Sequence, residues 1–132
     1  MLRLLSALER LLPGPVTAVL PNPERRYPLA CADDPERIGL RVPLLEGELA
    51  PLAGADWPVL QSSANPSGGN DAARLDAVDP VIRAGVDMVL DGGELPGTAS
   101  TGVSLVDYEQ DGSYEVLRPG ALPSSALDAV LR

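Results

Sequence analysis

Apolar residues recur at helical spacing over the first twelve positions of the chain. Their order predicts an amphipathic helix that ends at Pro13, with apolar positions at Leu2, Leu4, Leu5, Leu8, Leu11 and Leu12. The predicted helix begins at the first residue of the chain, so no N-cap residue precedes it. This favours a chain cut from something longer, and a normal helix with a frayed first turn is the alternative.

Short apolar runs of β type follow, and turns rich in proline and glycine separate them. They predict strands over residues 16–20, 38–42, 86–90, 103–108 and 114–117, and we expect the second of these to be buried. Residues 109–112 predict the turn of a hairpin between the last two strands. Helices are expected over residues 44–52, 71–78 and 80–84, and Ser124 or Ser125 can cap a last helix that runs to Leu131.

This mixture of strands and helices indicates an α/β fold of mixed, α+β-like character. We expect a single twisted open mixed sheet with flanking helices, formed as one domain over residues 1–132. The apolar runs are too short to cross a membrane, and charges interrupt the N-terminal segment, which makes it a poor signal peptide. A cytoplasmic location is therefore the expectation.

The composition removes several kinds of chemistry. Histidine is absent and Cys31 is the single cysteine, so His-assisted nucleophiles, the usual zinc sites and an internal disulfide are excluded. All ten basic residues are arginine, so Schiff-base and P-loop lysines are absent too. The net charge of −9 disfavours non-specific binding of nucleic acid, although a local group of arginines could still hold one nucleotide.

Three places in the chain carry groups suited to binding an anion. The loop over residues 62–70 (SSANPSGGN) concentrates hydroxyl and amide groups after an extended segment. Arg41 and Arg118 each stand at the end of a predicted strand, where a planar guanidinium can grip a phosphate or a carboxylate. On spacing alone, an ordinary turn explains the loop and a surface ion pair explains each arginine.

Taken in order, five segments resemble the motifs of the YrdC-like (YrdC/YciO) family. They are residues 11–20 (LLPGPVTAVL), 38–43 (IGLRVP), 59–68 (VLQSSANPSG), 86–93 (VDMVLDGG), and 106–107 (VD) followed by 116–121 (VLRPGA). Together they span nearly the whole chain, which is identified on this basis as a member of that family.

The resemblance implies a twisted mixed sheet around a polar cavity. The activity it implies is synthesis of L-threonylcarbamoyladenylate from ATP, L-threonine and bicarbonate, with release of pyrophosphate, for tRNA modification. ATP is then a substrate that arrives with Mg²⁺, and no tightly bound cofactor is expected. RNA and the proteins of tRNA modification are the other partners implied, because members of the family have been described as double-stranded RNA binders and translation factors.

The same motifs assign roles to residues of this chain. Ser63, Asn65 and Arg118 match nucleotide-binding positions, and Arg41 matches the arginine that faces the threonine carboxylate. The family's "STVVD" segment provides a hydroxyl on the threonine side, and here two alignments compete. Either Ser100 matches it, with an insertion of three residues after Thr101, or Ser104 takes the hydroxyl position.

Two parts of the family pattern have no counterpart in the sequence. These are the "PTDTVYGL" strand and turn and the "KxR" lysine–arginine pair, and the chain contains no lysine at all. We therefore expect a domain that lacks its N-terminal third, with a weakened phosphate site and an open sheet edge. The alternatives to an enzyme are a catalytically incompetent module that binds nucleotide or double-stranded RNA, and an interaction protein that forms a homodimer through the open edge.

Overall fold

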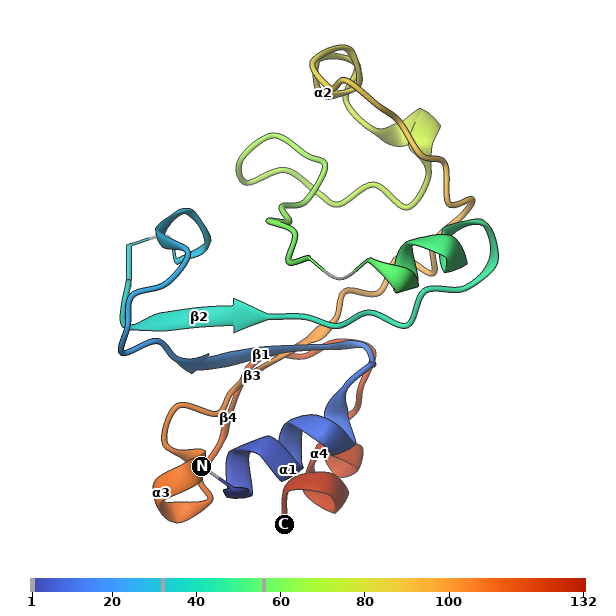
Figure 1. Cartoon of the computed structure of the whole chain (residues 1–132). Helices are drawn as coiled ribbons and strands as arrows, with labels where there is room; N and C mark the ends of the chain where they lie inside the picture. Colours follow the sequence, from blue (N-terminus) through green and yellow to red (C-terminus); the bar gives the residue numbers. More distant parts are fainter. Residues whose placement is uncertain (1, 32, 56) are drawn as a thin grey trace. The chain divides into compact units, whose positions relative to one another are not determined.

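The chain folds into two compact units, which are described separately (Figure 1). The computed structural model describes residues 2–31, 33–55 and 57–132, and Met1, where the sequence predicts the first helix to begin, lies outside them. One unit comprises Met1–Leu44 and Ala99–Arg132, and the other comprises Leu45–Thr98.

A four-stranded mixed sheet forms the centre of the first unit. Its strands are β1 (Val16–Pro21), β2 (Arg37–Leu40), β3 (Thr101–Ser104) and β4 (Glu115–Arg118), in the order β2-β1-β3-β4. β1 is antiparallel to β2 and parallel to β3, while β3 is antiparallel to β4. The predicted fold class, a mixed α/β fold with an open sheet and flanking helices, is confirmed.

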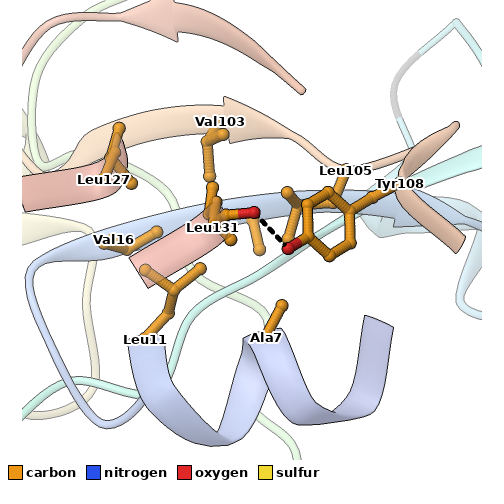
Figure 2. Packing of buried hydrophobic residues seen from close by; sticks show 9 residues of the cluster. Ala7, Leu11, Val16, Val103, Leu105, Tyr108, Leu127 and Leu131 are labelled. Atoms are coloured by element: carbon orange, nitrogen blue, oxygen red, sulfur yellow. Dashed lines mark hydrogen bonds between the residues drawn. The ribbon is translucent and has the colours of Figure 1, made fainter. Parts of the chain in front are cut away.

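The hydrophobic core lies between one face of this sheet and two helices, α1 (Leu2–Leu11) and α4 (Ser124–Leu131). The buried cluster consists of Ala7, Leu11, Val16, Ala18, Val103, Leu105, Tyr108, Leu127 and Leu131. Figure 2 shows this cluster at close range. Because Val16, Ala18 and Val103 all point into the core, the residues that alternate with them in β1 and β3 point to the opposite face.

A short helix completes the core at one end of the sheet. This helix, α3 (Tyr108–Asp111), begins with Tyr108, whose buried hydroxyl donates a hydrogen bond of 2.6 Å to the carbonyl oxygen of Leu131 (Figure 2). Gly112 ends the helix in the left-handed conformation, with φ at 81°. The predicted hairpin of the last two strands is therefore confirmed, but its connection is a helical turn rather than a plain β-turn, and β3 begins and ends earlier than predicted.

Two further predictions for this unit need correction. Among the described strands β2 pairs with β1 alone and lies at the sheet edge, so the prediction of a buried strand over residues 38–42 is wrong, and Leu40 and Val42 are exposed. The last helix has the predicted end, but Pro123 occupies its N-cap and no side chain caps it, so the predicted cap by Ser124 or Ser125 is wrong. A 3₁₀ helix, η1 (Pro28–Ala30), lies in the connection between β1 and β2.

The second unit contains short helical segments. They are the 3₁₀ helices η2 (Gly47–Gly54) and η3 (Leu75–Ala77) and the α-helix α2 (Pro80–Ala84). The prediction of α2 is confirmed, and its first turn is capped by the Asp79 carboxylate, which accepts a hydrogen bond of 2.8 Å from the backbone N–H of Val81. Of the helix predicted over residues 71–78, only η3 forms.

The predicted strand over residues 86–90 is wrong, because the described residues of the second unit form no strand. The run is apolar, yet Met88 is 73% exposed and Leu90 is 59% exposed. A β-strand requires a neighbouring strand to pair its backbone groups, and periodicity along one segment cannot show whether that neighbour exists.

Candidate functional site

Arg118, at the end of β4, is the centre of a polar cluster in the first unit. Its Nε and Nη2 atoms both donate to the carbonyl oxygen of Ser100, at 3.2 and 3.0 Å, and Nη2 also contacts the Ser100 hydroxyl at 3.1 Å. Ser100 immediately precedes β3 and is 6% exposed. Arg118 as a residue is exposed, so one edge of its guanidinium is fixed by Ser100 and the other edge can meet a ligand.

Thr17 extends this cluster across the sheet to β1. Its hydroxyl lies 2.8 Å from the hydroxyl of Ser100, and either oxygen can be the donor. Thr17 stands between Val16 and Ala18, which are fully buried in the core. The cluster therefore lies on the sheet face opposite to the helices α1 and α4.

A β-bulge in β4 directs Arg118 to this face. In a regular strand, Val116 and Arg118 would share one face, and Val116 packs against the core. The register instead pairs Val103 with Val116 and Gly102 with Arg118, which leaves Leu117 as an additional residue. Because a bulge shifts the alternation by one position, Arg118 points away from the core.

The segment after Arg118 lies unusually close to the start of β3. Ala121 donates a backbone hydrogen bond of 2.9 Å to Ala99, and a Cβ atom on Gly120 would lie only 2.4 Å from the carbonyl oxygen of Ala99. The buried Thr101 hydroxyl donates to the Leu122 carbonyl at 2.7 Å and accepts from the Leu122 N–H at 2.9 Å. These contacts hold the backbone of Ser100, and thus the acceptor that orients Arg118.

No carboxylate of the described residues forms an ion pair with Arg118 or with Arg41. The simple interpretation of each arginine as half of a surface ion pair therefore finds no support in the described part of the chain. Arg41 follows β2 and is exposed.

The two candidate serines of the threonine side differ in their surroundings. Ser100 contacts Arg118 and Thr17, as described above. Ser104 is the last residue of β3, where it is half-buried and pairs in register with Val19 and Glu115. The structure thus brings Ser100 and Arg118 together, and Ser104 lies at the far end of the strand.

The Ser/Asn loop belongs to the second unit and is organised by Asn65. The side-chain Nδ2 of Asn65 donates to the carbonyl oxygens of Pro66 and Gly69, both at 2.9 Å. Its Oδ1 is buried and has no hydrogen-bond partner among the described residues. Asn65 therefore closes the turn with its amide nitrogen, while Ser63 lies exposed in the same loop.

The sequence did not single out two residues that build this site: Thr17, a member of the Arg118 cluster, and Gly120, in the segment that holds the backbone of Ser100. Thr17 lies in the LPGPVT segment and Gly120 in the RPG segment, so both belong to motifs that the sequence showed. What was hidden is the pairing of β1 with β3 and of β3 with β4, which places Thr17, Ser100 and Arg118 in one cluster.

The described residues do not fit a resident metal site. No group of three or more Asp, Glu, Cys or His side chains gathers among them in a way that could hold an ion. Cys31 is buried with its thiol free. None of the helices within residues 2–31, 33–55 and 57–132 has the length and apolar character needed to span a membrane.

Comparison with known proteins agrees with the motifs. A family model named Sua5/YciO/YrdC and described as "Telomere recombination" matches residues 2–120. Comparison with curated proteins and comparison with solved structures each gave no match. Because the family model covers most of the sequence, including both motifs that build the Arg118 cluster, the chain belongs to the Sua5/YciO/YrdC family.

Proposed function

We propose that this chain binds ATP and L-threonine and serves the synthesis of L-threonylcarbamoyladenylate for tRNA modification. Membership of the family over residues 2–120 supports this proposal, because the family is linked to that reaction. The observation that carries it is Arg118, which is held by Ser100 at 3.0 Å and has no carboxylate partner among the described residues.

The chemistry of the reaction suits such a cluster. The threonine amine attacks the carbon of bicarbonate and water leaves, which gives a carbamate; a carbamate oxygen then attacks the α-phosphorus of ATP, and pyrophosphate leaves. Both partners are anions, and the electrostatic work is done by donors that are already oriented before the substrates arrive. No protein nucleophile is needed, so the absence of histidine is compatible with the reaction.

Individual roles follow from the motifs and from chemistry. Arg118 and Ser100 would receive an anionic group of a substrate, and Arg41 would face the threonine carboxylate. Ser63 and Asn65 would contribute to nucleotide binding from their loop.

The proposal is tested by incubating the pure chain with ATP, threonine and bicarbonate at millimolar concentrations. We expect release of pyrophosphate and a product with the mass of threonylcarbamoyl-AMP, both dependent on all three substrates. Calorimetric titration with ATP and with threonine runs alongside. Binding of either ligand without turnover would identify a binding module, and no binding of either would refute the proposed function.

A further inference from the structure

The hydrogen-bond donors of the Arg118 cluster can be assigned atom by atom. Nε and Nη2 of Arg118 face Ser100, and no described residue accepts from Nη1. Nη1 is therefore the part of the guanidinium that can donate to a ligand.

The paired hydroxyls of Thr17 and Ser100 supply a further donor. If Thr17 donates across the 2.8 Å contact, the Ser100 hydroxyl accepts from both Thr17 and Arg118 and keeps its own proton free. If Ser100 donates instead, the Thr17 proton stays free. In either case the pair supplies one O–H donor on the polar face of the sheet, beside the guanidinium.

We infer that Thr17 is a positioning residue of this site. Its hydroxyl orients Ser100 and thereby fixes Arg118, so that Nη1 and one hydroxyl proton converge on a single anionic group. That anionic group is a carboxylate or a phosphate. The inference rests on the proposed function, which supplies threonine as the source of the carboxylate and ATP as the source of the phosphate. Thr17 suits the task because its neighbours Val16 and Ala18 are fully buried, which fixes the backbone that carries it.

Replacement of Thr17 by valine removes the hydroxyl and keeps the shape and the β-branching, so the strand is expected to form. Thr17→Ser keeps the hydroxyl and should restore the wild-type behaviour. Thr98→Val is the control for removal of a threonine hydroxyl, because Thr98 is exposed and lies in the other unit.

The first measurement follows the Nε–H proton of Arg118 by NMR without any ligand, with its signal assigned from Arg118→Lys. In Thr17→Val we expect this proton to exchange with water severalfold faster, because the Ser100 hydroxyl, which accepts from Nη2, loses its Thr17 partner and the whole guanidinium is then held less firmly. Thr17→Ser and Thr98→Val should leave the rate within about twofold of wild type. An unchanged rate in Thr17→Val would overturn the inference, whatever the chain does with substrates.

The second measurement titrates ATP alone and threonine alone into the same variants. A loss of affinity in Thr17→Val of about tenfold or more for one ligand supports the inference and identifies that ligand as the source of the anionic group. Equal affinity of Thr17→Val and wild type for both ligands would overturn it. If wild type binds neither ligand, the proposed function falls, and the exchange rate of Arg118 still decides the role of Thr17.

Discussion

The direction of Arg118 depends on a single additional residue. Leu117 forms the bulge between the Val103–Val116 and Gly102–Arg118 pairs, and it turns the guanidinium away from the core. The carbonyl oxygen of Ser100 then accepts from two of its nitrogens, at 3.2 and 3.0 Å. A side chain so held loses little conformational freedom when it binds an anion, which is the physical advantage of the arrangement.

Arg118→Lys keeps the positive charge but removes this geometry. An ammonium group cannot bridge to Ser100 with one edge while offering another edge to a ligand, so we expect affinity for the substrate anion to fall about tenfold to a hundredfold. Calorimetry with ATP and with threonine measures the effect. Arg83→Lys, on the exposed end of α2, is the matched control and should bind like wild type. Equal binding by Arg118→Lys would show that charge alone matters.

Gly120 fixes the distance between the segment after β4 and the start of β3. Gly120→Ala places a methyl group 2.4 Å from the Ala99 carbonyl oxygen, where neither backbone can yield without breaking the adjacent hydrogen bonds. We expect the free energy of unfolding to fall by about 1–3 kcal/mol in denaturant titrations. Gly39→Ala is the control, because Gly39 lies in β2 of the same unit and the only atom within 4 Å of its added Cβ is a Thr17 methyl carbon at 3.8 Å, an ordinary contact. A loss of equal size in both variants would contradict the steric explanation.

Among the elements, helix α1 receives its N-terminal cap from a distant part of the chain. The Glu109 carboxylate of α3 accepts a hydrogen bond of 2.8 Å from the backbone N–H of Leu4. Glu109→Gln should lower the free energy of unfolding by about 0.3–1 kcal/mol, because it removes a negative charge from the positive end of the helix dipole. Glu115→Gln, on the exposed side of β4, should have a smaller effect. Salt should reduce the difference between the two variants, and a difference that persists in high salt would argue against the dipole.

Helix α4 is tied to the sheet through a tyrosine and a carboxylate. The Tyr114 hydroxyl donates to Asp128, which also pairs with Arg132 at 3.1 Å. This hydrogen bond to Asp128 raises the pKa of Tyr114 above its ordinary value of 10.0. A raised folded-state pKa favours the protonated form, so this contribution to stability is present below pH 10 and is lost as pH rises through the higher value.

The matched variant is Tyr114→Phe, compared with wild type in denaturant titrations at several pH values. Wild type should be the more stable protein at neutral pH, and its advantage should shrink as the pH rises above the ordinary tyrosine value of 10.0. If the difference in free energy of unfolding between wild type and Tyr114→Phe stayed constant across that pH range, ionisation of the Tyr114 hydroxyl would not be coupled to folding.

The elements that the sequence predicted correctly are those whose signals are local. α1 shows helical periodicity, and β1 lies between the proline-rich turns at 13–15 and 21–23. The strand predicted over 86–90 failed because its apolar run has no pairing partner among the described residues of the second unit. The choice between Ser100 and Ser104, and the direction of Arg118, depend on strand pairing and on a bulge, which no local pattern encodes.

At the scale of the whole molecule, the two units differ in how completely they bury their apolar side chains. The first unit has a contiguous core in which five side chains, Ala7, Val16, Ala18, Leu105 and Leu127, are among those with 0% exposure. In the second unit no described residue is buried, and Trp57, Val59 and Val81 are at least 70% exposed. Apolar burial is the main source of stability, so the second unit should open at a much lower free energy than the first.

Amide hydrogen exchange tests this difference with two matched N–H groups. The Leu105 N–H bonds to the Val19 carbonyl at 2.9 Å in the first unit, and the Leu95 N–H bonds to the Ala73 carbonyl at 2.8 Å in the second. The bonds have similar lengths, yet we expect Leu95 to exchange at least about a hundredfold faster, because opening there exposes no buried core. Equal rates would contradict the difference in stability.

ATP should slow exchange over residues 62–69 if the Asn65 loop contributes to nucleotide binding, since a ligand that binds the ordered loop stabilises it by mass action.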